Sequence, residues 1–284
     1  MTLHTIDQGP RDGDVVVVLH SGGMSSRQWR KLIELLSKTR RAVAPDFLGS
    51  GQNPPWPADA PFHFDDDVAA VDDLIKGIGK PVHLVGHSYG GLACLVLARR
   101  DPMRVRSLCL YDPVAWGVLQ DDDDAALGAA ARARVLTNAS GPGVLGGPRG
   151  AGATPGLDTM NPVGGSAAWF EQFVDYWSGE GAWQGLSEGA RGAFLAVGRK
   201  VFLEVASLLA DQTPASSYAD IQAPTILLRG EHTPIAAQRV SAILAKAMPA
   251  ATLHTVAGAG HMGPITHADV VNELIAAHIA AATR

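Results

Sequence analysis

The chain has 284 residues, of which 46% are hydrophobic and 18% are charged, and its formal net charge at neutral pH is −5. This length suits one large domain or two smaller ones, and the mild acidity leaves no basic surface for binding nucleic acid. No run of residues is long and apolar enough to span a membrane, and the first ten residues lack the pattern of a secretion signal, so we expect a cytoplasmic protein without a membrane partner.

Six short apolar runs along the chain are typical of strands, because each is followed by glycine, proline or a lone polar residue. In chain order, the runs cover residues 15–19, 41–44, 82–85, 105–111, 225–228 and 252–256. Their apolar residues are continuous rather than alternating, which indicates strands that are buried on both faces. The runs therefore predict a mostly parallel sheet.

Helical patterns separate these runs. Apolar residues recur with a spacing of about 3.6 at residues 29–37, 66–75, 92–99 and 268–281. The alternation of strands and helices predicts an α/β fold, with a doubly wound sheet covered by helices on both faces. In such sheets, functional groups gather on the loops beyond the carboxyl ends of the strands.

Residues 116–221 break the alternation, because they contain no convincing strand pattern. Instead they predict helices at residues 121–136, 166–177 and 191–209. We therefore expect a core made of residues 1–115 and 222–284, with a helical insertion between its two parts.

Within the insertion, residues 140–156 are too rich in glycine and proline for regular structure, which favours a surface loop or a lid segment. Residues 141–146 of this loop fit the dinucleotide-binding pattern GxGxxG. They follow a helical pattern rather than a strand and open no βαβ unit, so we reject dinucleotide binding.

The sequence GHSYG at residues 86–90 is the most informative motif. It fits GxSxG, directly follows an apolar strand pattern and precedes an apolar helix. A strand that turns sharply into a helix crowds its neighbours, which requires the flanking glycines and exposes Ser88 at the helix N-terminus. Ser88 is therefore the candidate nucleophile.

Three further motifs accompany this one, namely HSGGM at residues 20–24, PDFLGSG at 45–51 and GAGH at 258–261. In this order, the four motifs make the chain resemble the α/β-hydrolase superfamily over most of its length. The resemblance implies a helical cap inserted after the family's sixth strand, which is the run 105–111 here. This position matches the insertion at residues 116–221.

A serine hydroxyl needs a base within hydrogen-bond reach before it can attack a carbonyl. His261 is the best candidate among ten histidines, because it lies in a glycine loop just past the end of a predicted strand. His87 adjoins Ser88 in the sequence, but the sharp turn directs neighbouring side chains apart.

The third member of a catalytic triad has two candidates in the sequence. The family commonly has an aspartate after the run 225–228, but Thr233 stands there and cannot hold the positive charge of a histidine. Some branches carry the acid after the sixth strand, where this chain has Asp112. We predict Asp112 as the acid, and Glu231 is the alternative.

For the oxyanion hole, the positions in the motifs predict the backbone amides of Gly22 and Tyr89. Ser21 replaces the glycine of the family's oxyanion loop, so Gly23 stays open as an alternative to Gly22.

We expect neither a metal nor a cofactor. Cys94 and Cys109 lie inside apolar runs and cannot build a disulfide scaffold or a thiolate site, and no HExxH pattern is present.

The sequence predicts a serine hydrolase that cleaves small to medium apolar esters, an esterase or lactonase. The alternatives are a perhydrolase, a carbon–carbon bond hydrolase, or a ligand-binding protein without activity. Ser88 argues against epoxide and haloalkane hydrolases, which use a carboxylate nucleophile.

The insertion contains an aromatic helix face made of Trp169, Phe173, Tyr176 and Trp177. This face is expected mainly to pack the insertion onto the core. We take Trp116 and Trp177 as candidate substrate-binding residues, which would suit an apolar small-molecule ester. The sequence leaves the oligomeric state open.

Overall fold

In the computed structural model, the described residues are 2–57, 59–140, 159 and 163–283. Among them, the strands form one sheet in the order β1-β3-β2-β4-β5-β6-β7. The strands are β1 (Thr5–Gln8), β2 (Val15–Leu19), β3 (Arg41–Pro45), β4 (Val82–His87), β5 (Val105–Tyr111), β6 (Thr225–Gly230) and β7 (Ala251–Val256). All pairs are parallel except β1 with β3. All six predicted runs form strands, which confirms the predicted fold class.

The strand β1 was not predicted from the sequence. It is a short edge strand of four residues with the sequence TIDQ, and none of its residues is fully buried. A strand of this kind lacks the continuous apolar run by which the buried strands are found.

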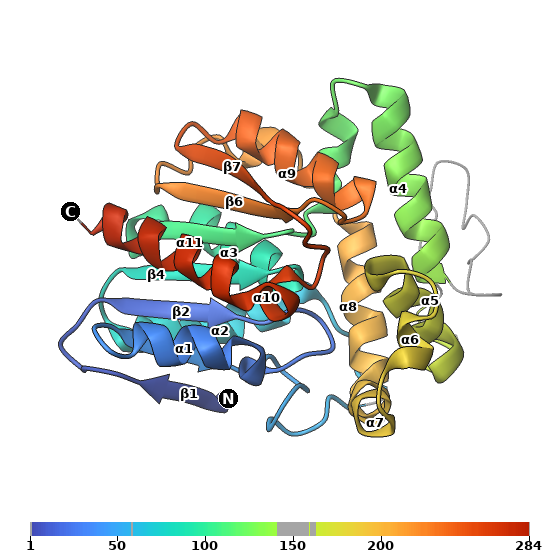
Figure 1. Ribbon diagram of the computed structural model, residues 1–284, viewed down its shortest axis with the longest axis horizontal. Helices are drawn as coiled ribbons and strands as arrows, with labels where there is room; N and C mark the ends of the chain where they lie inside the picture. The colour runs from blue at the N-terminus through green and yellow to red at the C-terminus, as the bar shows by residue number, and fades with distance from the viewer. Residues whose placement is uncertain (1, 58, 141–158, 160–162, 284) are drawn as a thin grey trace.

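Helices cover both faces of the sheet (Figure 1). Those of the core are α1 (Arg30–Leu36), α2 (Phe64–Ile78), α3 (Tyr89–Arg100), α9 (Ile235–Ala247), α10 (Gly263–Thr266) and α11 (Ala268–Ala282), with short 3-10 turns η1 (Ser26–Trp29) and η2 (Pro102–Arg104). Side chains of α1 and α11 pack on one face, whereas those of α2, α3 and α9 pack on the other. α9 was not predicted from the sequence, although Val240, Ile243 and Leu244 are among its buried residues.

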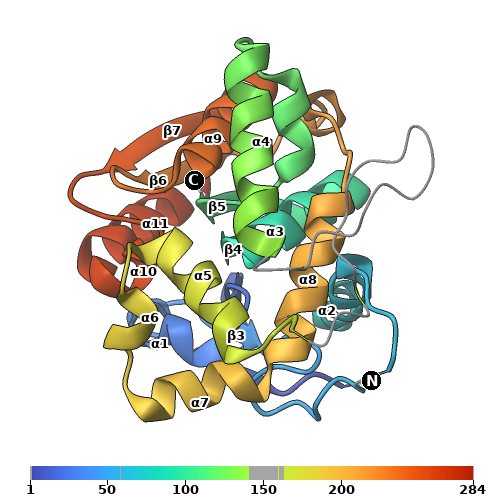
Figure 2. The same ribbon diagram turned by 90° about the vertical axis from the view of Figure 1, so that its right-hand side faces the viewer.

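The helical insertion, residues 116–221, leaves the sheet after β5 and returns at β6. Its described helices are η3 (Trp116–Asp121), α4 (Ala125–Ser140), α5 (Ala167–Ser178), α6 (Ala182–Gly185), α7 (Glu188–Ala196), α8 (Gly198–Ala210) and η4 (Ala215–Tyr218). They lie beyond the ends toward which the parallel strands point (Figure 1) and surround the ends of β4 and β5 in Figure 2. The glycine-rich segment 140–156 lies outside the described residues apart from Ser140, as does the rejected motif at 141–146.

One helix predicted in the insertion is wrong, because residues 191–209 form the two helices α7 and α8. The helical backbone is interrupted at Val197, which has φ −110° and ψ 7°. The next residue, Gly198, lies so close to Gly165 that a Cβ there would approach the Gly165 carbonyl oxygen to 2.2 Å. This close approach fixes where α8 begins.

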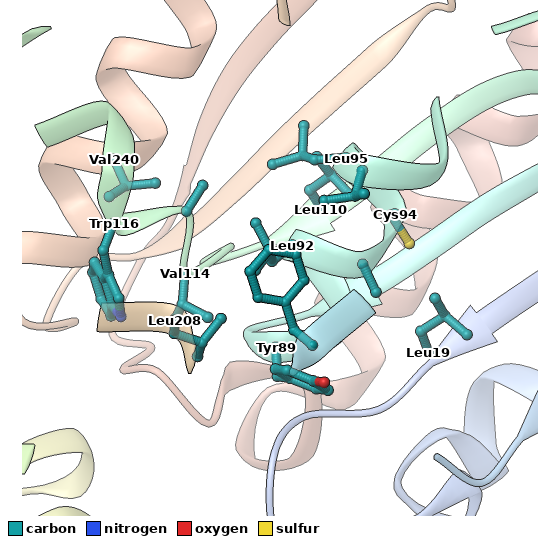
Figure 3. Close-up of a cluster of buried hydrophobic side chains, with 14 of the residues drawn as sticks. Leu19, Tyr89, Leu92, Cys94, Leu95, Leu110, Val114, Trp116, Leu208 and Val240 are labelled. Carbon is teal, nitrogen blue, oxygen red and sulfur yellow. The ribbon is translucent and has the colours of Figure 1, made fainter. Parts of the chain in front are cut away.

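The apolar core continues from the sheet into the insertion. Figure 3 shows Leu92 of α3 in one cluster with Leu19 of β2, Leu110 of β5, Trp116 of η3 and Leu208 of α8. Full burial of such a side chain stabilises a fold by about 1.5–3 kcal/mol. The insertion is therefore packed onto the sheet by the same apolar cluster that holds α3.

None of the described helices combines the length and the apolar character that crossing a bilayer requires.

Candidate active site

Ser88 lies at the turn between β4 and α3, where its backbone has a strained φ of 54° and ψ of −115°. A Cβ on Gly86 would lie 2.4 Å from the Gly90 carbonyl oxygen, and one on Gly90 would lie 2.4 Å from that of Leu19. Both positions therefore require glycine. Crowding of this kind around a strained serine is characteristic of a nucleophile elbow.

His261 and Asp112 meet beyond the carboxyl ends of their strands. His261 lies in the loop after β7, and its Nδ1 is 3.2 Å from Oδ2 of Asp112, which follows β5. Both side chains are buried. A histidine that donates from Nδ1 to a carboxylate keeps Nε2 free to accept a proton. No hydrogen bond joins Ser88 to His261 in the structure, and in unliganded enzymes this contact often forms only with substrate bound.

The structure places Asp112, and not Glu231, beside His261. The side chain of Glu231 is 52% exposed, and its carboxylate accepts a hydrogen bond from the amide of Gly258 at 2.7 Å. Thr233, which stands where the resemblance leads one to expect an aspartate, donates its hydroxyl to Asp112 Oδ2 at 2.7 Å. The threonine therefore supports the neighbouring acid.

The predicted oxyanion residues lie on two loops next to Ser88. Gly22 follows β2 and Tyr89 begins α3, and both line one chamber with Ser88 and Gly23. The amides of Gly22, Gly23 and Tyr89 donate to no other residue that the structure describes, whereas the amide of Ser21 donates to Gln28 Oε1 at 3.0 Å. Tyr89 and either glycine are thus available to bind an oxyanion.

The chamber has a volume of about 430 Å³ and is lined by residues of both the core and the insertion. Ser88 and His261 line it together with Trp116 and Trp177. The ring of Trp177 stacks on that of His261, with 3.8 Å between the centroids, and on that of Trp116 at 5.9 Å. Trp169, on the same helix as Trp177, is instead fully buried. The aromatic face of α5 therefore divides between packing and the chamber.

Known proteins resemble this chain in sequence and in fold. The profile of the Alpha/beta hydrolase family matches residues 16–274. The chain belongs to this family.

Among curated relatives, lipase LipV of Mycobacterium tuberculosis is 38% identical over 112 residues, 39% of this chain and 41% of the lipase. The 2-hydroxymuconate semialdehyde hydrolase of a Pseudomonas species is 38% identical over 104 residues, 34% of this chain and 36% of that enzyme. The chain matches less than half the length of either relative. Among solved structures, the meta-cleavage product hydrolase CumD of Pseudomonas fluorescens superposes with a TM-score of 0.69 at 21% identity, covering 98% of this chain and 94% of CumD.

Burial sets the protonation of the pair in this hydrolase-family site. It lowers the pKa of His261 to about 3, so the imidazole is neutral at neutral pH, as a general base requires. Burial also raises the pKa of Asp112 well above its usual range, and the hydrogen bond from Thr233 opposes this shift. An imidazolium formed at His261 during reaction would favour the ionised carboxylate beside it.

His87 does not face Ser88 but holds the His261 loop, in agreement with the expectation that the turn separates the two side chains. Its Nε2 donates to the carbonyl oxygen of His261 at 2.8 Å, and its Nδ1 accepts from Gln28 Nε2 at 3.0 Å. Gln28 Oε1 in turn accepts from the amide of Ser21 on the oxyanion loop. Burial lowers the pKa of His87 well below its usual value, which keeps the ring neutral for both bonds.

The sequence analysis missed a buried ion cluster made of Asp67, Lys200 and Glu204. Lys200 and Glu204 lie four residues apart on α8, and Lys200 Nζ is 2.5 Å from Oδ2 of Asp67 on α2. All three are buried, and Glu204 lines the chamber. The available signal was two charged residues at a spacing of four inside the apolar run KVFLEVASLLA.

Within the described part of the chain, no group of three or more histidine, cysteine, aspartate or glutamate side chains is placed to hold a metal ion.

Proposed function

We propose that the protein is a serine hydrolase that cleaves small to medium apolar carboxylic esters, as an esterase or lactonase. The observation that carries the proposal is the 3.2 Å contact between Asp112 Oδ2 and His261 Nδ1, in a chamber that Ser88 also lines. This arrangement provides a nucleophile, a base and an acid that orients the base.

In the proposed mechanism, His261 takes the proton of Ser88 as the serine oxygen attacks the ester carbonyl. The amides of Tyr89 and Gly22 hold the oxyanion, with Gly23 as the alternative to Gly22. Collapse releases the alcohol, protonated by His261, and leaves an acyl group on Ser88. Water activated by the same histidine then releases the acid.

We further propose that the helical insertion acts as a cap over a core of residues 1–115 and 222–284. The chamber between them is lined by aromatic and aliphatic side chains from both parts. Trp116 and Trp177 would contact the apolar portion of the substrate. Because Trp177 stacks on His261, this contact would lie next to the reacting carbonyl. The relative named as a lipase supports ester chemistry.

A second candidate is a carbon–carbon bond hydrolase that uses the same triad. It is favoured by the relative named 2-hydroxymuconate semialdehyde hydrolase. The two candidates share the nucleophile and differ in the bond that is broken. Rates of cleavage of phenyl butyrate and of 2-hydroxymuconate semialdehyde would separate them.

A fluorophosphonate probe tests the shared part of both candidates. We expect the wild type to be labelled and Ser88→Ala not to be labelled. Ser178→Ala is the matched control, because Ser178 also lines the chamber but has no base assigned to it. An unlabelled wild type, or equal labelling of Ser88→Ala, would contradict the proposed function.

A further inference from the structure

Glu204 is the one carboxylate among the described residues that line the chamber. It is 1% exposed, and one carboxylate oxygen, Oε1, accepts a hydrogen bond from Lys200. The other, Oε2, is hydrogen-bonded to no residue that the structure describes, and it lies 2.8 Å from where a Cβ on Gly22 would stand. A polar atom without a partner therefore sits at the proposed oxyanion loop.

The charges of the buried ion cluster do not balance if all three groups are ionised. One ammonium, on Lys200, serves two carboxylates, which leaves the cluster with a net charge of −1 in a buried place. Asp67 is the better satisfied carboxylate, because it also accepts from Tyr89 Oη at 2.7 Å and from the amide of Leu48 at 2.8 Å. Glu204 accepts only from Lys200, so a proton taken up by the cluster resides on Glu204.

The pKa of Glu204 supports this distribution of charge. Burial raises the pKa of Glu204 to about 7, although the ammonium of Lys200 opposes the shift and the carboxylate of Asp67 adds to it. Near neutral pH, Glu204 is therefore present in both forms. Oε2 is an acceptor in the carboxylate and a hydroxyl donor in the carboxylic acid. The groups facing Glu204 are Lys200 on its own helix and, from the core, Asp67 of α2, the phenol of Tyr89 of α3 and the backbone of Gly22.

We propose that Glu204 Oε2 binds a hydroxyl group of the substrate, carried within two carbon atoms of the scissile carbonyl. This inference rests on the proposed ester hydrolysis and names its substrate class, the esters or lactones of 2-hydroxy or 3-hydroxy acids. The position of Oε2 beside Gly22 limits how far the hydroxyl can lie from the scissile carbonyl, because the amide of Gly22 is a proposed donor to the carbonyl oxygen. A hydroxyl suits Oε2 in both protonation states, since it can donate to a carboxylate and accept from a carboxylic acid.

The chemistry of the chamber disfavours other groups at Oε2. A substrate carboxylate would be repelled by the ionised form, and a substrate ammonium, which has donors only, could not accept a hydrogen bond from the protonated form. An ester without the hydroxyl would leave Oε2 unpaired against apolar surface, and sites built to hydrogen-bond a hydroxyl reject analogues that lack it. We expect the wild type to prefer the hydroxy ester at least about tenfold in kcat/KM.

Paired esters test the inference, namely methyl 3-hydroxybutyrate against methyl butyrate and methyl lactate against methyl propionate. The readout is the ratio of kcat/KM within a pair for the wild type, Glu204→Leu, Glu204→Gln and Glu188→Gln. Glu188 is an exposed glutamate of the same insertion and serves as the matched control. We expect at least one pair to show a ratio above about ten in the wild type and in Glu188→Gln.

In Glu204→Leu the ratio should fall to about one. In Glu204→Gln the preference for the hydroxy ester should be partly retained, because glutamine keeps hydrogen-bonding groups.

The outcomes separate this inference from the proposed function. If the wild type is labelled by the fluorophosphonate and hydrolyses the esters with both ratios near one, the inference is overturned and the proposed function stands. If both members of a pair lose rate equally in the Glu204 variants, Glu204 has only a structural role and the inference is overturned. If the wild type is neither labelled nor active, both proposals fall. Should Glu204→Leu not fold, the wild-type ratios and Glu204→Gln still decide.

Discussion

Two buried groups of ionisable side chains adjoin the chamber, and they are assembled from different parts of the fold. Asp112 and His261 come from loops at the carboxyl edge of the sheet, and Thr233 from a third such loop completes their contacts. The buried ion cluster joins a core helix, α2, to an insertion helix, α8. The residues of the first group all come from loops of the sheet, although Trp177 of the insertion stacks on His261, whereas the second group forms only when the insertion is docked.

From this difference we expect the first group to act in the reaction and the second group in substrate recognition. The loops after β5, β6 and β7 carry the proposed acid, its threonine partner and the proposed base, all on strands in parallel register. The ion cluster carries the one carboxylate among the described chamber residues. Changes in the first group should therefore act on turnover, and changes in the second on stability and substrate choice.

The largest expected effect is on turnover, from Asp112→Asn. The amide cannot stabilise an imidazolium and favours the wrong tautomer of His261, so we expect kcat to fall by about 10⁴-fold. Glu231→Gln is the matched control and should stay within about threefold of the wild type, because Glu231 contacts the Gly258 amide rather than His261. Steady-state hydrolysis of phenyl butyrate measures both. Loss of turnover in Glu231→Gln with Asp112→Asn unaffected would assign the acid to Glu231.

The second expected effect is on stability, from Lys200→Met. Removal of the ammonium leaves Asp67 and Glu204 close together without their shared cation. Breaking a buried ion pair in this way lowers the free energy of unfolding by about 3–5 kcal/mol. Lys246→Met is the control, because Lys246 pairs with Asp123 at the surface and should change stability by less than about 1 kcal/mol. Urea unfolding measures both, and equal small changes would show that the cluster does not hold the insertion.

Much of the fold could be predicted from the sequence, because buried parallel strands appear in it as continuous apolar runs. VVVVL at β2 is such a run, and all five of its residues are buried. The edge strand β1 could not be found in this way, because its pairing with β3 comes from the tertiary structure rather than from its own pattern. The break between α7 and α8 depends on a contact of Gly198 with Gly165, which is equally nonlocal.

The residues of the candidate site differ in the same way, because some are visible in the local sequence and others depend on nonlocal contacts. Ser88 and Asp112 directly follow strands and His261 lies in the loop after β7, so the sheet brings all three to one edge. Their positions, together with the resemblance to the family, led to these predictions, with Glu231 left as the alternative acid. Glu204 lies inside a helix whose docking against α2 sets its surroundings. No local sequence pattern indicates which side of a helix contacts a distant carboxylate. The role proposed for Glu204 could therefore be inferred only from the three-dimensional structure.

A smaller effect is expected from Thr233→Val, which sharpens the comparison within the first group. Valine keeps the shape of threonine but removes the hydroxyl that donates to Asp112 Oδ2. Losing this donor should raise the pKa of Asp112 further and cost about 1.4 kcal/mol in transition-state stabilisation, or roughly tenfold in kcat/KM. Thr252→Val, on the exposed side of β7, is the control. An unchanged kcat/KM for Thr233→Val would show that the hydroxyl does not support the acid.

The smallest effect concerns pH and compares the two groups directly. Burial lowers the pKa of His261, and the neutral base is present above that pKa and lost only as the pH falls through it. In Glu204→Gln, which removes the carboxyl that titrates at about 7, kcat/KM for methyl butyrate should change less than about twofold from pH 8 to 5.5. A histidine with the ordinary value of 6.5 would lose about tenfold over this range. Quantifying the released acid by chromatography gives the profile. A tenfold loss would mean either that the His261 pKa is not lowered during catalysis or that Asp112, whose pKa burial raises, takes up a proton in this range. An inflection near pH 7 that occurs only in the wild type would belong to Glu204.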